Sequence, residues 1–186
     1  MKFSSMIFFL ICVPLPSRQV HVVPALREIV LSKDEQEVYE VLFQKYSYLE
    51  KVVVCPNLTF CWGLDGHEGP EGYWKFFCSS DSLRSDGVVI AQYRKAFENI
   101  VIKSKQSGRI RQWNQKIQIR NTDICVESPE FTTISFSPIG FDIKNGLAIV
   151  FAEGSDSLRG GSGSYYFLKK IGGHWHIESS MLAWIT

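Results

Sequence analysis

Residues 131–186 read FTTISFSPIGFDIKNGLAIVFAEGSDSLRGGSGSYYFLKKIGGHWHIESSMLAWIT, and this stretch decides the fold. Short apolar runs alternate in it with breaks that contain glycine. This alternation is typical of antiparallel strands joined as hairpins. The chain has no Gly-x-Ser-x-Gly elbow, no His-Glu-x-x-His helix and no dinucleotide fingerprint. The stretch therefore predicts an architecture without predicting a reaction.

Two dipeptides in this stretch predict where the chain turns. Asn145-Gly146 is a two-residue hairpin turn, because both positions tolerate a positive φ. That register places six apolar residues on one face: Ile139, Phe141, Ile143, Ala148, Val150 and Ala152. The opposite face is also partly apolar, so we expect a helix or a second layer over it. Gly172-Gly173 predicts the next turn, between Ser164–Ile171 and His174–Trp184.

The region before residue 131 predicts two helices. Ser32 and Glu35 form a capping box, which satisfies backbone N–H groups at a helix start. A helix is expected from Lys33 to about Tyr48. A second is expected from near Asp86 to Lys103, because its apolar residues recur at helical spacing. These residues are Val89, Tyr93, Ala96, Phe97 and Ile100.

Shorter segments separate and follow these helices. Val52–Val54 is β-branched throughout and predicts a strand, and Gln115–Arg120 alternates as a half-buried strand does. Residues 63–72 hold too many glycines for a regular element and are expected to form a loop. The order predicts an α+β domain, with N-terminal helices packed on one face of a curved antiparallel sheet of about five to six strands.

The N-terminus predicts export. Lys2 is followed by the apolar run Met6–Val13, and Pro14, Pro16 and Ser17 come after it. This is the pattern of a secretory signal peptide, and the run is far shorter than the roughly 20 residues of a membrane span. We expect residues 1–17 to be removed, 18–31 to be a linker and 32–186 to form one domain. A secreted or periplasmic protein is expected.

Two alternatives stay open at this end of the chain. The apolar run would also suit an N-terminal strand of a cytosolic protein. Cys12 is a further possible processing site, since a cysteine near the end of a leader can carry a lipid, although Ile11 before it is larger than that processing usually tolerates.

Composition excludes several classes of partner. The chain is 45% hydrophobic and 13% aromatic, which argues against disorder. Its formal charge of +1 falls to zero when Lys2 is lost with the leader. Without a basic excess we expect no nucleic acid as partner, and no integral membrane segment once the leader is removed. The expected partner is a protein or a small molecule.

Four cysteines remain in the mature chain: Cys55, Cys61, Cys78 and Cys125. An even number in an exported protein is compatible with two disulfides, and four cysteines allow three connectivities. The spacing does not choose among them. No pair has the Cys-x2-4-Cys spacing of a structural zinc site, and no His-x3-5-His accompanies them. Buried free thiols are the other interpretation.

Three groups of polar residues are candidate sites. The cluster Asp65, His67, Glu68 and Glu71 could support acid–base or cation chemistry, but its glycines favour a solvated loop. His174 and His176 share one face of a strand, yet Lys169 and Ile171 fall opposite them, which favours a surface pair over metal ligands. Residues 154–163, with Arg159, could cradle an anion. They lack the ending of a phosphate-binding loop and favour a hairpin connection.

The chain also resembles a known group of proteins. Residues 141–150 and 163–175, with the ending Trp184-Ile185-Thr186, resemble the C-terminal block of an uncharacterised family of small, mostly bacterial, often exported proteins. That block has a "GFN-x-x-x-T-x-A-L-V-Y" strand, a Gly/Cys-rich loop, a "Y-x-L-L-E-K-K-x-G-K-W" hairpin and a closing "W-I/V-S" strand. The resemblance implies an exported domain of unknown activity. Residues 154–163 lack the cysteines that this loop often holds.

The sequence thus favours an exported, non-enzymatic domain that binds a partner, with no cofactor, metal or catalytic residue. The alternative is a small hydrolase or lyase-like enzyme with its site in the concavity of the sheet. Four aromatic residues are expected to fill the core: Tyr165, Tyr166, Trp175 and Trp184. Any that are exposed would be natural anchors for a partner.

Overall fold

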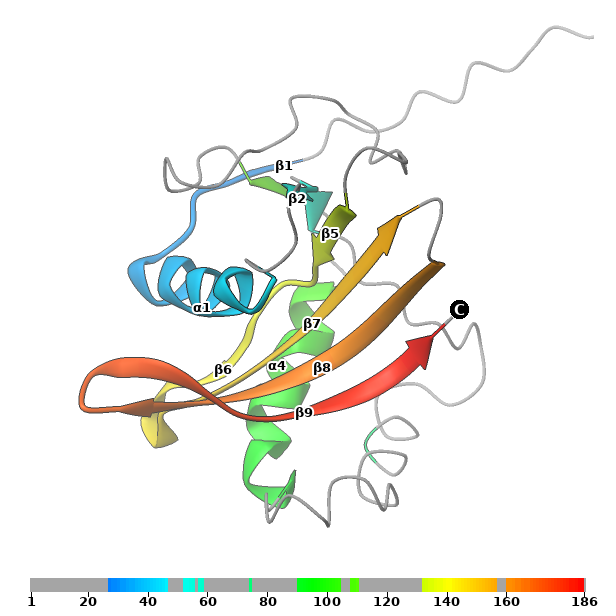
Figure 1. Ribbon diagram of the computed structural model, residues 1–186. Helices are drawn as coiled ribbons and strands as arrows, with labels where there is room; N and C mark the ends of the chain where they lie inside the picture. Colours follow the sequence, from blue (N-terminus) through cyan, green and yellow to red (C-terminus); the bar gives the residue numbers. More distant parts are fainter. Residues whose placement is uncertain are drawn as a thin grey trace, which may run out of the picture.

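Figure 1 shows the computed structural model, which describes residues 27–46, 52–55, 57–58, 74, 90–104, 108–110, 132–156 and 160–185. In chain order the elements are β1 (Arg27–Ile29), α1 (Lys33–Lys45), β2 (Val52–Val54), β3 (Asn57–Leu58), a 3-10 turn (Ile90–Tyr93), α4 (Arg94–Ser104), β4 (Gly108–Ile110), β5 (Thr132–Phe136), β6 (Gly140–Asp142), a second 3-10 turn (Ile143–Asn145), β7 (Leu147–Asp156), β8 (Gly160–Ile171) and β9 (His174–Ile185). The strands β1, β3 and β4 are not predicted by the sequence pattern.

Most strands belong to one sheet. Its order is β2-β5-β7-β8-β9, with β6 also paired to β7, and every pair is antiparallel except β2 with β5. The strands β1, β4 and β3 form a second, small sheet. The α+β class with a curved, mainly antiparallel sheet is therefore confirmed.

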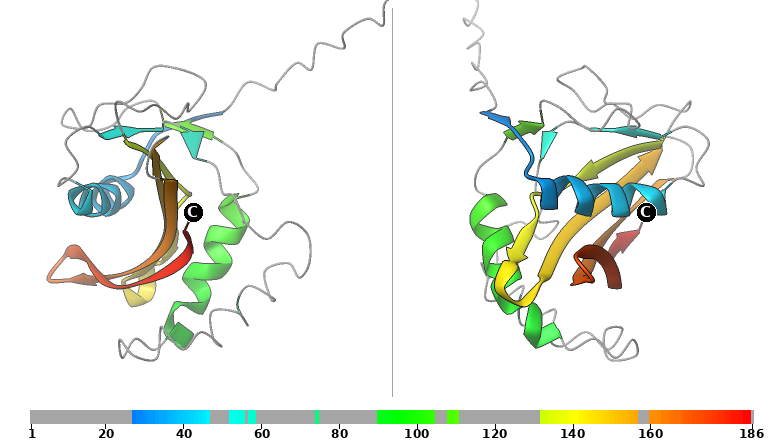
Figure 2. Two further views of the ribbon diagram at one scale, coloured as in Figure 1. Left: turned by 45° about the vertical axis from the view of Figure 1, so that its right-hand side comes forward. Right: turned by 90° about the vertical axis from the view of Figure 1, so that its left-hand side faces the viewer.

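The main sheet is covered on both faces. The long strands bend toward α1, which lies on the concave face, while α4 lies on the convex face (Figure 2). The cluster under α1 includes Ala148, Val150 and Ala152, and the cluster under α4 includes Leu147, Ile149 and Phe151. The expectation that both helices pack on one face is wrong, because β7 is apolar at even and odd positions alike. The layer that was expected over the second apolar face of β7 is α4.

The helix α1 begins as the capping box predicts. The Glu35 N–H donates to Ser32 Oγ at 3.2 Å, and the Ser32 N–H donates back to the Glu35 carboxylate at 2.9 Å. The helix ends at Lys45, three residues before the expected end. Its buried face consists of Val38, Tyr39 and Leu42.

In the part of the chain that the structure describes, the second α-helix begins later than expected, at Arg94. A 3-10 turn over Ile90–Tyr93 leads into α4, and Asp86 lies outside the described residues. The strand β6 runs directly against α4. A Cβ at Gly140 would overlap the Ala96 carbonyl oxygen and approach Ile100 Cβ to 2.8 Å, so only glycine fits this crossing.

The two turns differ in how well they were predicted. Gly172 and Gly173 have φ of 59° and 89°, and His174 pairs with Ile171 as expected. At the other turn a 3-10 segment forms, since the Asn145 side chain donates to Asp142 Oδ2 at 2.6 Å. Phe141 then pairs with Ala148. The register predicted from a two-residue turn is therefore wrong by two positions. Phe141 stays on its expected face, but Ile143 is 62% exposed.

The glycine-rich residues 154–163 include the end of β7 and the start of β8. β7 and β8 stay paired as far as Asp156 and Gly160, so the connection is a hairpin that is shorter than the expected loop. The expected leader, the loop at 63–72 and the strand at 115–120 lie outside the described residues. Neither helix in the described part is long and apolar enough to cross a membrane.

The crossing of β6 and α4 generates a prediction. Replacing Gly140 with Ala should lower the free energy of unfolding by about 3 kcal/mol or more, because backbone atoms of α4 must move. Urea denaturation measures this loss. The matched control is Gly172→Ala, where no atom lies within 4 Å of the added Cβ and the positive φ alone should cost about 1–2 kcal/mol. Equal losses in the two variants would contradict the close packing.

Candidate functional site

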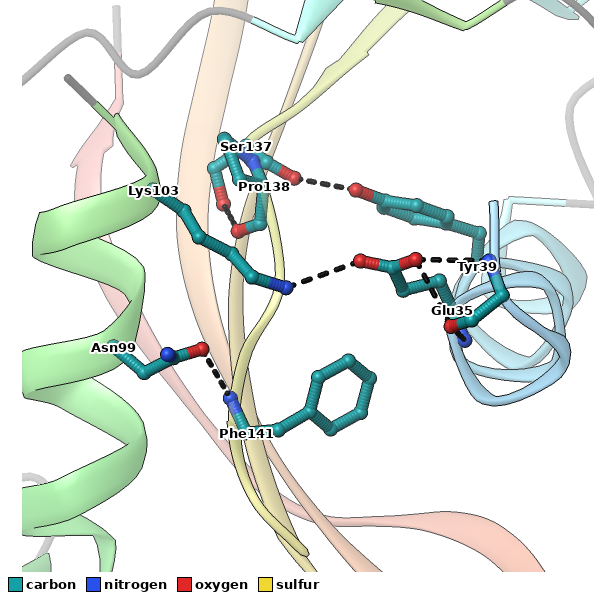
Figure 3. A network of polar contacts seen from close by, with 8 residues as sticks. Glu35, Tyr39, Asn99, Lys103, Ser137, Pro138 and Phe141 are labelled. Atoms are coloured by element: carbon teal, nitrogen blue, oxygen red, sulfur yellow. Dashed lines mark hydrogen bonds and ion pairs between the residues drawn. The ribbon is translucent and has the colours of Figure 1, made fainter. Parts of the chain in front are cut away.

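Polar contacts join the two helices across the sheet (Figure 3). The Lys103 ammonium, in the last turn of α4, donates to Glu35 Oε1 in the first turn of α1 at 3.1 Å. Burial disfavours the charged form of Glu35, but the Ser32 N–H and Lys103 outweigh that cost and hold its pKa below the usual range. Glu35 therefore serves as a cap and as a link between layers.

The buried hydroxyl groups of this region are also satisfied. The Tyr39 hydroxyl donates to the Ser137 carbonyl at 2.8 Å, and the Phe151 N–H donates to Ser137 Oγ at 2.9 Å. Burial raises the pKa of Tyr39 well above its usual value. A tyrosine that stays neutral and donates its hydroxyl hydrogen bond to the backbone stabilises the fold rather than serving as a reactive group.

A second set of acids holds the β8–β9 hairpin against α1. Asp34 accepts from Lys170 Nζ at 2.5 Å and from Trp175 Nε1 at 3.0 Å, and these bonds keep its pKa below the usual value. Glu37 accepts from the Trp175 N–H at 3.1 Å and contacts His174 Nδ1 at the same distance. Trp175 is only 2% exposed, in line with its expected place in the core.

The predicted histidine pair occupies the expected positions. His174 lies opposite Ile171, and His176 lies opposite Lys169. Both are exposed. In the part of the chain that the structure describes, no three metal-binding side chains gather.

A β-bulge directs one more carboxylate into a structural contact. Phe167 pairs with Ser179 and Leu168 with Ile177, so Glu178 is the extra residue of β9. Its side chain points to the α4 side, where Glu178 Oε2 accepts from the Tyr93 hydroxyl at 2.5 Å. Burial, and then this carboxylate, raise the pKa of Tyr93.

Glu153 differs from these acids. It lies on β7 at an odd position, on the α4 side of the sheet, and is half-buried. No described residue forms a hydrogen bond or an ion pair with its carboxylate. Burial is the cause that raises its pKa. A half-buried carboxyl that lacks a partner costs stability, which is common at functional sites.

The surroundings of Glu153 form a regular grid on three adjacent strands. Ser135 of β5 and Gly163 of β8 flank Glu153, and two positions along β7 Thr133 and Gly161 flank Ser155. We call these six residues the Glu153 patch: Thr133, Ser135, Glu153, Ser155, Gly161 and Gly163. The patch begins where the apolar contacts of α4 end, after Phe151. It offers one carboxyl, hydroxyl groups and two positions without side chains.

The patch can accept and donate hydrogen bonds but holds one ionisable group. Cross-strand neighbours have Cβ atoms about 4.5–5.5 Å apart, so Ser135 is within reach of a ligand held by Glu153. General acid–base catalysis usually needs a second positioned acid or base. None of the other five patch residues supplies one. The arrangement suits binding better than catalysis.

Of the cysteines and the acidic cluster indicated by the sequence, the structure describes only Cys55. Cys55 follows β2, is 4% exposed, and its N–H donates to the Ile134 carbonyl at 2.7 Å. The other three cysteines and the whole acidic cluster lie outside the described residues: Cys61, Cys78, Cys125, Asp65, His67, Glu68 and Glu71.

Glu153 was missed by sequence reasoning, although a signal was present. On β7 the odd positions Leu147, Ile149 and Phe151 are all apolar, and the next odd position is a glutamate. A charged residue at a position predicted to be covered is a candidate site. The residues beside Glu153 on β5 and β8 can be identified only from the register of the strands.

No protein-family model matches this chain, and no curated protein or solved structure is significantly similar to it. The geometry of the Glu153 patch is therefore the basis for a functional proposal.

The cost of burying Glu153 can be measured. Because burial raises its pKa, the folded state binds the proton more tightly than the unfolded state, and stability falls as pH rises through that raised pKa. Glu153→Gln should therefore raise the free energy of unfolding at neutral pH by roughly 0.5–2 kcal/mol. The gain should shrink below the ordinary value of 4.5, where the wild-type carboxyl is protonated in both states.

Urea denaturation at neutral and acidic pH measures this difference. The matched control is Glu98→Gln, which removes the same charge from a carboxylate paired with Arg94 on the surface of α4. That change should cost about 0.5 kcal/mol or less. A Glu153→Gln protein that is less stable than the wild type at neutral pH would contradict the absence of a partner.

Proposed function

We propose that this chain is an exported domain that binds another molecule and catalyses no reaction. The observation that carries the proposal is the Glu153 patch, a half-buried carboxyl among hydroxyl groups and glycines without a second ionisable side chain. Elsewhere in the described part, Asp34 and Glu178 link helical segments to strands, and Glu35 links the two helices. Their chemistry is used for folding.

The proposed compartment is the periplasm or the exterior of a bacterial cell. It is supported by the basic and apolar N-terminus and by the resemblance to small exported proteins. A disulfide at Cys55, which we include in the proposal, adds a further argument, because disulfides persist in oxidising compartments.

A small hydrolase or lyase-like enzyme is the second candidate. One observation favours it, because a carboxyl whose pKa is raised by burial can act as a general acid. However, Glu153 is at an odd position of β7 and so lies on the α4 side of the sheet. The concave face is the one on which α1 packs (Figure 2). A binding role needs only the groups that the patch contains, whereas catalysis usually needs a second acid or base.

Export and oxidation are tested by mass spectrometry of the protein secreted by a bacterial host. The expected mature chain starts at Arg18, and its mass rises on reduction by one hydrogen for each of the four cysteines. Retention of the protein in the cytosol with residues 1–17 attached would contradict the proposal.

Binding is tested with a library of small polar compounds and a ¹⁵N-labelled protein. We expect saturable shifts in the amide signals of Ser135, Glu153 and Gly163 with some compounds. Glu98→Gln should keep these responses, because Glu98 lies on the outer face of α4. A spectrum that no compound changes at the patch would contradict a binding role.

A further inference from the structure

The residues that the structure describes provide no counter-ion for the charge of Glu153. Several cations of the described part are engaged elsewhere: Lys103 with Glu35, Lys170 with Asp34, Lys169 with Glu178 and Arg94 with Glu98. No described residue forms an ion pair with Glu153. A half-buried carboxylate is stabilised most by an opposite charge that also donates hydrogen bonds.

The hydroxyl groups beside Glu153 narrow the kind of cation. Ser135 lies directly across from Glu153, and Ser155 is two residues further along the same face. Both are half-buried and therefore still reach solvent. With the carboxylate they present three acceptors on one side of the sheet. A primary ammonium carries three N–H donors, whereas a quaternary ammonium carries none.

The β8 side of the patch limits steric hindrance. Gly163 is buried, but Gly161 is half-buried and has no side chain, so an ammonium and its first carbon atoms meet backbone at Gly161 rather than another side chain. Thr133 and Ser135 close the β5 side with small hydroxyl-bearing groups. The patch thus fits a compact polar head better than a broad aromatic ring.

We propose that the Glu153 patch binds the primary ammonium group of a small molecule, with Glu153 as its counter-ion and the hydroxyl groups of Ser135 and Ser155 as acceptors. This inference rests on the proposed binding function and names the class of ligand.

The test is a titration of the ¹⁵N-labelled full chain with three probes. The n-butylammonium ion carries the required charge and donors, tetramethylammonium carries the charge alone, and n-butanol is the neutral counterpart. We expect saturable shifts of the Ser135, Glu153, Ser155 and Gly163 amides with n-butylammonium only. A lysine tripeptide is titrated in parallel, and tighter binding of that peptide would assign the ammonium to a protein side chain and overturn the small-molecule source.

Variants separate the roles of the groups. Glu153→Gln should weaken n-butylammonium binding at least about tenfold, because a hydrogen bond to a charged group is lost. Ser135→Ala should weaken it less, and Glu98→Gln should leave it unchanged. Binding that survives in Glu153→Gln would overturn the assignment even though that variant is expected to fold.

The two levels of the proposal fail differently. If n-butylammonium leaves the patch unchanged while a neutral or anionic compound of the wider library shifts it, the ligand class is wrong and the binding function stands. If no compound shifts the patch, both are overturned.

Discussion

The burial of β7 on both faces is the constraint on which the rest of the structure depends. Its even-numbered residues pack under α1 and its odd-numbered residues under α4. A strand that is apolar on one face needs one covering layer, but this strand needs two. The two helices, the curvature toward α1 and the close crossing at Gly140 all follow from that requirement.

The polar contacts keep these layers in place. Acids in the first turn of α1 hold Lys103 on one side and the β8–β9 hairpin on the other. Because each of these acids has a partner, each one lowers the cost of bringing polar groups into the folded protein. Glu153 has no such partner among the described residues, and it stands where the apolar contacts of α4 end. A group that the fold does not require is the best place to look for function.

Local signals predicted the elements better than the layers. The capping box at Ser32 and the Gly172-Gly173 turn are decided by a few neighbouring residues, and both were confirmed. The Asn145-Gly146 turn was wrong by two positions, since the Asp142 side chain stabilises a 3-10 segment that the dipeptide alone does not indicate. The placement of α4 depends on contacts between residues far apart in the chain.

The candidate site was the least predictable part for the same reason. The sequence pointed to residues 65–71 and to the histidines, where polar residues are close in sequence. Ser135, Glu153 and Gly163 belong to three strands, and only the register brings them together. The one local signal was a glutamate at a position of β7 where the preceding odd positions are apolar.

The pKa of Glu153 itself tests this account most directly. It can be followed by the pH dependence of the side-chain carboxyl carbon in ¹³C NMR, with Glu153→Gln to assign the signal. The account predicts a pKa above the ordinary value of 4.5 in the free protein. A pKa at or below that value would mean that the carboxylate already has a partner within the chain, and would contradict the central claim.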